Sequence, residues 1–434
     1  MPDTKRPKPP ETSERPDQPE PPVSLNTSKR IAIITMGVKL GTEEKGYTRF
    51  LSLSEQLSAA GFEVDLITSS FQHWEKRHRA TDDPALHSYP FTVSLIDEPG
   101  YRQNIDFRRL ISHRKAARNL TEHLRHTGPY SLIYCEIPPN DIARRASEYA
   151  RAHNIPLILD INDLWPEAMR MVFDVPVLST LLFAPFVRDA RIACKNAAAF
   201  VGTSDEYALY PLRYRPDDTE HITVYVGNEL ARFDAFAKEN SPQISKPAGE
   251  FWVTYAGTLG ASYDIETMLR ASDELARRGY DSIRTLIIGG GPDQKRLEDL
   301  AQTLSGKTTF VGYLDYPQMA AYLTHSDVLV NSLVKKAPQS IVNKIADYVA
   351  AGKPMINTGE SPELKALVNR ENIGINCNAE EVGTLTSAIL SLFTDPDTRE
   401  KMGGNARRLA TQHFDRATSY QQIIALITRH LPLP

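Results

Sequence analysis

The sequence predicts an α/β protein made of two doubly wound domains that face each other across a cleft. Apolar strand-like runs alternate with helix-like segments in two series, at about residues 30–226 and 251–358. The runs that open the two series, I-A-I-I-T-M at 31–36 and F-W-V-T-Y-A-G at 251–257, are nearly continuous, as in strands covered on both faces. A chain of 434 residues also exceeds what one ordinary core accommodates. Because such sheets bind ligands beyond the carboxyl ends of their strands, we expect the functional residues at the cleft.

Composition excludes several classes of protein. The apolar and charged fractions, 41% and 24%, are ordinary for a globular protein, and the net charge of −4 argues against a dedicated nucleic-acid partner. Cys135, Cys194 and Cys377 lie far apart without a C-x-x-C pair, which indicates buried thiols in a reducing compartment. No signal peptide is visible, and the longest apolar run, 175–187, is too short for a bilayer and contains two prolines. We therefore expect a cytoplasmic protein.

The N-terminal part divides into a tail and a first domain. Residues 1–28 are rich in proline and charge with almost no hydrophobic side chains, which predicts a disordered tail. Residues 29–230 form the predicted first domain, which begins with a βαβ unit: strand 31–36, glycine-containing loop 37–46, helix 47–60 and strand 62–68. Further strands are expected at 92–96, 131–136, 156–161, 199–203 and 222–226.

The remaining chain gives a linker, a second domain and a final helix. Residues 231–250 are polar, contain two prolines and show no period, so we interpret them as a linker. Residues 251–412 form the predicted second domain, and residues 413–434 include a helix at 418–430 that we expect to cross back to the first domain. Strands of the second domain are expected at 251–257, 284–291, 308–313, 327–331 and 354–358.

The segment 337–356, A-P-Q-S-I-V-N-K-I-A-D-Y-V-A-A-G-K-P-M-I, is the most informative stretch. Ser340 is a typical N-cap residue, and Gly352 followed by Pro354 marks a helix end. The helix would bury an apolar face and present Asn343, Lys344 and Asp347 on another, near its N-terminus, where an anion is favoured. The alternative is an ordinary amphipathic helix without a ligand.

Glycine-containing loops follow strands of the second domain and favour a nucleotide diphosphate site. They comprise 256–260, 289–292, Gly312–Tyr313 and the loop 338–340 that precedes the helix. Glycine lets a ligand approach the backbone, and loop-to-helix junctions offer N–H groups to phosphates. Neither a G-x-G-x-x-G after the first strand of a domain nor a P-loop is present, which argues against a dinucleotide cofactor and against a P-loop nucleotide site.

The second domain resembles that of the retaining GT-B glycosyltransferases of family 4. Their signature has two acidic residues eight positions apart followed by A-x-A-x-G-x-P-V-I; here Asp347 matches the second acid and Gln339 replaces the first. The run N-K-I-A-D-Y-V-A-A-G is similar to S-K-I-Y-E-Y-M-A-A-G of cell-envelope and capsule enzymes. Residues 159–167, L-D-I-N-D-L-W-P-E, are close to R-D-L-W-P-E of that subgroup, with Asn162 in place of arginine, and I-P-P-N at 137–140 matches its Pro-Pro loop.

The resemblance implies a GT-B architecture of two Rossmann-like domains and assigns donor residues. Asp347 would hold the donor ribose, Gln339 would approach the transferred sugar, and Lys344 would neutralise the leaving diphosphate, unless it is an ordinary solvated lysine. Gly46, at the start of the first helix, would face the phosphates from the first domain, and Gly312 with Tyr313 would flank the nucleobase. The remaining expected donor residues are Gly257, Thr258, Gly260, Gly291, Ser340 and Asn343.

Acceptor residues are expected at strand ends of the first domain. Glu136, Asn162 and Asp163 are positioned to orient an acceptor hydroxyl, although Asp163 could equally cap a turn. The family retains anomeric configuration by front-side attack, for which no protein nucleophile is required. We expect no cofactor beyond the nucleotide-sugar co-substrate and no metal, and we interpret Asp395-Pro396-Asp397 as a turn.

The implied function is transfer of a sugar to a lipid-linked or other saccharide acceptor in surface or exopolysaccharide synthesis. The basic segment 102–126 and the apolar run 175–187 would then contact the inner face of an anionic membrane, whereas the simpler interpretation is a solvated surface. Two other functions stay open: a GT-B nucleotide-sugar epimerase, which needs carboxylates and histidines around the sugar, and a non-catalytic nucleotide-sugar binding module.

Overall fold

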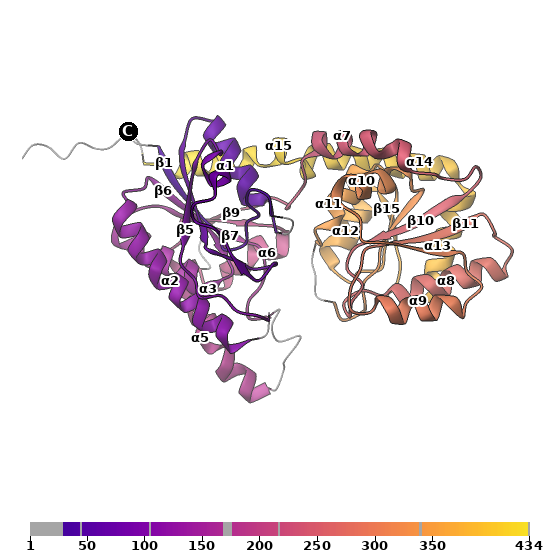
Figure 1. The fold of residues 1–434 in the computed structure, drawn as a ribbon, viewed down its shortest axis with the longest axis horizontal. Coiled ribbons are helices and arrows are strands. Elements are labelled where there is room, and N and C mark those ends of the chain that lie inside the picture. The colour runs from indigo at the N-terminus through magenta and orange to yellow at the C-terminus, as the bar shows by residue number, and fades with distance from the viewer. Residues whose placement is uncertain are drawn as a thin grey trace, which may run out of the picture.

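The structure is a computed structural model that describes residues 29–43, 46–103, 106–167, 176–215, 218–337 and 341–432. It consists of two α/β domains joined at one side by helices (Figure 1). The two-domain α/β architecture predicted from the alternating pattern is confirmed. The predicted disordered tail, 1–28, lies outside the described residues, as do Gln339 and Ser340.

The first domain contains a seven-stranded parallel sheet in the order β5-β2-β1-β6-β7-β8-β9. Its strands are β1 (Arg30–Ile34), β2 (Glu63–Ser69), β5 (Thr92–Ile96), β6 (Leu132–Ile137), β7 (Leu157–Ile161), β8 (Ala199–Gly202) and β9 (Glu220–Thr223). The connecting helices are α1 (Arg49–Ala59), α2 (Phe107–Thr127), α3 (Asn140–Ala152), α5 (Pro176–Asn196) and α6 (Asp205–Leu209). A short hairpin of β3 (Phe71–Gln72) and β4 (Arg77–His78), which the sequence did not predict, follows β2.

The second domain repeats this design with a six-stranded parallel sheet in the order β12-β11-β10-β13-β14-β15. The strands are β10 (Phe251–Ala256), β11 (Ile283–Ile288), β12 (Thr308–Gly312), β13 (Val328–Asn331), β14 (Met355–Asn357) and β15 (Gly374–Asn376). The helices are α8 (Ile265–Arg277), α9 (Gln294–Gln302), α10 (Tyr316–His325), α11 (Lys344–Ala350), α12 (Pro362–Glu371), α13 (Val382–Thr394) and α14 (Pro396–Leu409). Asp395 accepts a hydrogen bond from the Thr398 amide, so it caps α14, as the interpretation of this segment as a turn requires.

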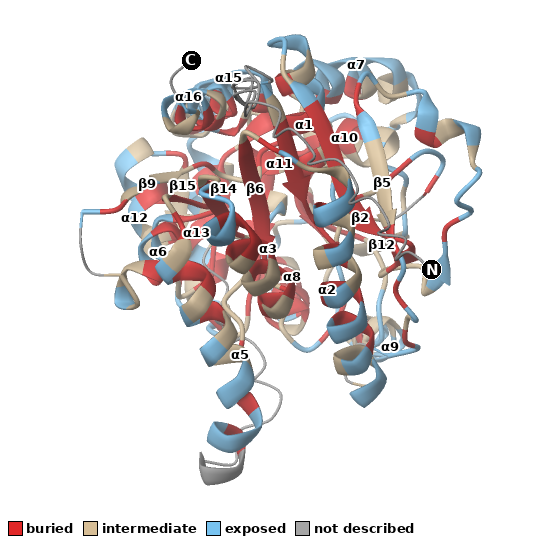
Figure 2. Cartoon of the chain, turned by 90° about the vertical axis from the view of Figure 1, so that its left-hand side faces the viewer, coloured by how far each residue is buried: buried red, intermediate tan, exposed pale blue. Residues whose placement is uncertain are grey.

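Both faces of each sheet are covered, which explains the continuous apolar runs. In β1, Ile31 and Ile33 join one apolar cluster, and Ala32 and Ile34 join another on the opposite face. Figure 2 shows most strands in the buried colour at the centre of the molecule, with exposed residues on the outer sides of the helices and on loops. The three cysteines are free and buried, as predicted.

The predicted linker at 231–250 is wrong for its first half. Residues Leu230–Asn240 form helix α7, whose Leu230, Phe233 and Ala237 are buried in the apolar core beneath α10 and α11 of the second domain. These three residues are spaced at intervals of three and four, which is a helical period. The period was difficult to recognise in the sequence because it is short and polar residues lie between the three.

The C-terminal segment crosses from the second domain to the first. Helices α15 (Arg416–Ser419) and α16 (Gln421–His430) follow α14, and Tyr420, Ile423 and Leu426 are buried in the same cluster as Ile31 and Ile33. Asn228 lies in the connection from the first domain to the second, and Asp415 lies in the segment that returns to the first domain. The two residues pair through an isolated β-bridge. The packing of α16 therefore ties the domains together. Among the described residues, no helix combines the length and the apolar character that a bilayer span requires.

Candidate active site

A cavity of about 390 Å³ lies between the two domains. The first domain contributes Tyr47, Arg49 and Asn162, and the second contributes residues of the loop after β10 and of the start of α11. The second-domain lining includes Gly257, Thr258, Tyr263, Asn343 and Lys344. Because parallel strands of both sheets end here, the cavity occupies the position expected for a ligand site.

Lys344 is the first residue of α11, so this helix starts later than the Ser340 cap predicted, with Asn343 at the N-cap. Its Nζ lies 4.0 Å from the ring centroid of Tyr255 and 4.3 Å from that of Tyr263. This Nζ is buried and has no hydrogen-bond partner among the described residues. Burial lowers the pKa of Lys344 to about 7. Since two aromatic faces stabilise the cation but satisfy none of its three donors, the arrangement is suited to an anionic ligand. The alternative of an ordinary solvated lysine is therefore wrong.

Gly257 allows the lysine to reach this position. A Cβ at residue 257, which has φ +151°, would lie 2.7 Å from Lys344 Nζ. Thr258 follows it in the cavity wall, and its carbonyl accepts a 2.7 Å hydrogen bond from the Tyr255 hydroxyl. The first glycine loop thus shapes the space around the ammonium group.

The other predicted glycines have different roles. A Cβ at Gly291 would lie 2.2 Å from the Leu259 carbonyl, so this glycine lets two loops pack together. Gly260 stands beside Pro292 in the same pair of loops. Neither belongs to the lining of the interdomain cavity. Gly312 faces open space, and Tyr313 is 79% exposed, so both are accessible at the end of β12.

Asp347 lies one turn beyond Lys344 on α11. Its Oδ1 accepts hydrogen bonds from the Tyr316 hydroxyl at 2.7 Å and from Asn228 Nδ2 at 3.2 Å. Burial raises the pKa of the Asp347 carboxyl. Asn228 belongs to the segment that connects the domains, so this carboxylate joins α11, α10 and the interdomain connection. It stands outside the lining of the interdomain cavity.

Gly46 was predicted at the start of the first helix, and this is wrong. Helix α1 begins at Arg49 with Thr48 at its N-cap, and Gly46 packs against Lys39 at φ +131°. Tyr47 instead faces the cavity. Arg49 is buried and forms a bidentate ion pair with Asp160, at 2.9 and 3.2 Å, which the sequence analysis did not anticipate.

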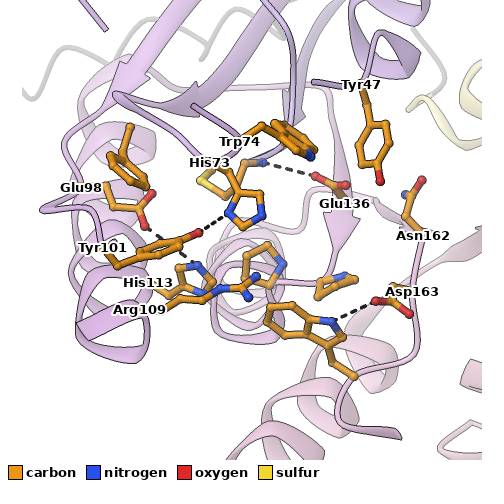
Figure 3. A pocket seen from close by; sticks show the side chains of 16 residues that line it. Tyr47, His73, Trp74, Glu98, Tyr101, Arg109, His113, Glu136, Asn162 and Asp163 are labelled. Atoms are coloured by element: carbon orange, nitrogen blue, oxygen red, sulfur yellow. Dashed lines mark hydrogen bonds and ion pairs between the residues drawn. The ribbon is translucent and has the colours of Figure 1, made fainter. Parts of the chain in front are cut away.

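A second cavity, of about 310 Å³, lies in the first domain and contains the three predicted acceptor residues (Figure 3). Glu136 Oε2 accepts hydrogen bonds from Thr35 Oγ1 at 2.6 Å and from the Met36 amide at 3.3 Å. Burial raises the pKa of Glu136 to about 7. Tyr47 and Asn162 line both cavities, so the two spaces adjoin at these two residues.

Asp163 fulfils the alternative role suggested by the sequence while also lining the cavity. Its Oδ1 accepts from the Leu164 amide at 2.8 Å, as in a turn cap, and its Oδ2 accepts from Trp165 Nε1 at 3.1 Å. Burial raises the pKa of the Asp163 carboxyl. The carboxylate therefore orients the indole of Trp165 at the cavity wall.

Sequence reasoning missed one side of this first-domain cavity. The missed residues come from the β3–β4 hairpin, the loop before α2 and α2 itself: His73, Trp74, Glu98, Tyr101, Arg109 and His113. Figure 3 shows Tyr47, Glu136, Asn162 and Asp163 at one end and Glu98, Tyr101 and Arg109 at the other. The available signal was F-Q-H-W-E-K-R-H at 71–78, which combines aromatic and ionisable residues between two strands.

Comparison with known proteins gives one family match. Residues 236–409 match the family model described as Glycosyl transferases group 1. A glycogen synthase of Mycobacterium tuberculosis is 28% identical over 163 residues, which cover 37% of this chain and 38% of the relative. The chain spans between 38% and 61% of the length of the curated relatives that it matches.

Solved structures resemble the whole two-domain chain. Sucrose-phosphate synthase from Thermosynechococcus elongatus superposes with a TM-score of 0.69 at 20% identity, covering 92% of this chain and 98% of the other. Alr3699/HepE of Anabaena, solved in complex with UDP, gives a TM-score of 0.66 at 14% identity, covering 92% and 100%. The chain therefore has the GT-B fold, and its residues 236–409 match the glycosyl transferases group 1 model.

Proposed function

We propose that this protein is a retaining glycosyltransferase that moves a sugar from a nucleotide-diphosphate donor to a saccharide acceptor. The observation that carries the proposal is the buried Lys344 ammonium in the interdomain cavity, which has no hydrogen-bond partner among the described residues. An unpaired buried cation is costly, and a diphosphate would supply the missing charge and acceptors. The group 1 match and the UDP complex of a structural neighbour support the same donor class.

The donor diphosphate would lie against Lys344, Gly257 and Thr258, with Asn343 at the N-cap of α11. As the glycosidic bond breaks, negative charge grows on the diphosphate, and the ammonium stabilises that charge more in the transition state than in the ground state. The nucleoside would extend toward Asp347 and the accessible end of β12 at Gly312 and Tyr313. A ribose hydroxyl would then share the carboxylate with Tyr316 and Asn228.

The acceptor hydroxyl would enter from the first-domain cavity past Glu136 and Asn162, and Asn162 also lines the donor space. Front-side attack requires the hydroxyl on the same face as the leaving diphosphate, so positioning and electrostatics supply most of the rate enhancement. No protein nucleophile is needed in this route. Gln339 and Ser340, to which the resemblance assigns contacts with the sugar and diphosphate, lie outside the described residues.

The acceptor would be presented at the inner face of a membrane during surface or exopolysaccharide synthesis. Exposed apolar side chains on α2 and α5 support this: Phe107 is 70% exposed and Leu181 is 70% exposed. Exposed basic side chains accompany Phe107 along α2, including Arg108, Arg114 and Lys115. The N-terminal half of α5 projects from the body of the first domain in Figures 1 and 2.

This membrane contact has a direct test. Co-sedimentation with vesicles containing one third phosphatidylglycerol should retain the wild-type chain at low salt, and F107S/L181S should reduce the bound fraction at least fivefold. Insertion of the apolar side chains and attraction of the basic side chains to anionic lipids both contribute to membrane binding. Vesicles of neutral phosphatidylcholine should therefore bind the chain weakly. Equal binding of the variant would show that this face is a solvated surface.

A nucleotide-sugar epimerase is the second candidate, because carboxylates and histidines do gather in the first-domain cavity. They stand on the acceptor side, however, and the described lining of the interdomain cavity contains neither carboxylate nor histidine. An epimerase would convert a nucleotide sugar alone, whereas a transferase requires an acceptor.

The deciding assay incubates the protein with a panel of nucleotide sugars, with and without a membrane-extract acceptor fraction. Radiolabel transferred to the acceptor fraction, with the anomeric configuration of the donor, is the expected result. Epimerised donor without acceptor would favour the epimerase, and tight nucleotide binding without turnover of any donor would leave only a binding module.

A further inference from the structure

We infer that the first-domain cavity receives an uncharged pyranose ring of the acceptor and selects against anionic sugars such as uronic acids and sugar phosphates. The inference rests on the proposed function, since it specifies the acceptor of the same transfer. At about 310 Å³, the cavity is near the lower limit for small-molecule sites, which matches one or two sugar rings.

The walls of the cavity offer fixed aromatic surfaces. Trp165 is held by its hydrogen bond to Asp163 and by Arg109, whose guanidinium lies 4.7 Å from the indole centroid. Trp74 packs edge-to-face with Tyr47 at 4.9 Å, and Gly37 leaves space for its indole, because a Cβ there would be 3.2 Å from Trp74 Cη2. The C–H face of a pyranose packs well against such rings, so the cavity provides an apolar surface with polar ends.

The polar groups nearest the donor space are acceptors of hydroxyl protons. Glu136 is fixed through Oε2 by Thr35 and Met36, and Asp163 is fixed by the Leu164 amide and Trp165. Asn162, between the two cavities, adds an amide. Sugar hydroxyls can donate to these carboxylates, whereas a carboxylate or phosphate on the sugar would be repelled by them.

The remaining ionisable groups leave the described lining with more carboxyl groups than cations. His73 and His113 are uncharged near neutral pH, because burial lowers their pKa values to about 4 and about 3. Arg109 is the only cation in the described lining, and its guanidinium lies 4.7 Å from the ring centroid of Trp165 and 5.5 Å from that of Tyr101. Three carboxyl groups line the same cavity, those of Glu98, Glu136 and Asp163, so a further anion would meet more like charge than opposite charge.

Matched pairs of sugars test the inference with the full chain. Methyl and aryl glycosides of glucose, galactose and mannose are compared with the corresponding uronic acids, with UDP present. Binding is measured by saturation-transfer NMR, and transfer is measured as acceptor kcat/KM. We expect neutral glycosides to be preferred at least tenfold over their uronic acids. Trp165→Leu should weaken binding of the neutral glycoside at least tenfold while the Kd for UDP stays within twofold.

Tyr280→Leu, at an aromatic position of the second domain that lines neither cavity, is the matched control and should bind like wild type. Neutral-sugar binding that depends on Trp165 but without transfer would support the cavity assignment and refute the proposed reaction. Transfer with equal or better use of uronic acids would refute this inference and leave the reaction intact. Absence of binding by every sugar, or binding unaffected by Trp165→Leu, would also overturn the inference.

Discussion

Replacing Lys344 by methionine tests the donor site most directly. Methionine keeps an unbranched side chain between Tyr255 and Tyr263 but removes the ammonium. Lys344 is the only side-chain cation that the second domain contributes to the described lining of the cavity. If the diphosphate binds there, the variant lacks the cation that would pair with it.

The magnitude follows from the charge and its burial. An ammonium and a phosphate oxygen about 4 Å apart attract by about 4 kcal/mol at an effective dielectric constant of about 20. At about pH 8 the free protein must first protonate Lys344, whose pKa is about 7, and this costs about 1.4 kcal/mol. The remaining difference of roughly 2–3 kcal/mol corresponds to about 30- to 150-fold weaker binding of the nucleotide by the variant.

The pH dependence of UDP binding and of thermal stability gives two further expected results. Wild-type affinity for UDP should fall toward tenfold per pH unit above pH 7, because the protonated fraction of Lys344 falls at that rate. The methionine variant should lack this decline. In the free protein, the lowered pKa of Lys344 destabilises the fold below pH 7, and this penalty disappears as pH rises from 7 toward 10.5. The variant should therefore unfold at a higher temperature than wild type at pH 6.

Isothermal titration with UDP between pH 6.5 and pH 9 is the appropriate assay, together with thermal unfolding of the free proteins. Lys295→Met is the matched control, because Lys295 is 87% exposed on α9. It should keep the wild-type affinity and its pH dependence. A methionine variant that binds UDP within threefold of wild type at pH 7, with an unchanged pH profile, would refute a diphosphate contact by Lys344.

Three further changes test other parts of the site. Asp347→Ala should weaken UDP binding about tenfold, because it removes the carboxylate assigned to the ribose; an unchanged Kd by titration would remove that role. Glu136→Gln should abolish a rise in kcat/KM through about pH 7, the pKa of Glu136, if the ionised carboxylate accepts the acceptor hydroxyl proton; a pH–rate profile like that of wild type would contradict this. Arg49→Met should lower the free energy of unfolding by about 3–5 kcal/mol, since it leaves Asp160 buried and unpaired; denaturant titration that shows less than 1 kcal/mol would contradict it.

Local patterns predicted the framework well. Strands covered on both faces produce continuous apolar runs, and glycine and proline mark their ends, so the βα alternation was visible in each domain. Glu136, Asn162 and Asp163 could be grouped in advance because carboxyl ends of neighbouring parallel strands meet at one edge. Lys344 was singled out by its position near the start of a predicted helix.

Other elements carried too little local signal. The β3–β4 hairpin has two residues in each strand, too few for an alternating pattern, yet it brings His73 and Trp74 into the first-domain cavity. Helix α7 buries only three apolar side chains and resembled a linker. Gly46 was misplaced because the start of α1 depends on contacts outside the helix, including the Thr48 hydroxyl that accepts a hydrogen bond from Arg416.

The order of apolar and turn-forming residues along the chain was sufficient to determine the two doubly wound domains and the sheet edges at which the two cavities lie. Those features depend on interactions between residues a few positions apart. The state of Lys344 was decided by tertiary structure alone: Tyr255 lies in β10 and Tyr263 in the loop after it, and only their packing against α11 buries the ammonium. Burial and charge compensation depend on residues distant in sequence, and for that reason the three-dimensional fold was needed to distinguish an anion site from a solvated lysine.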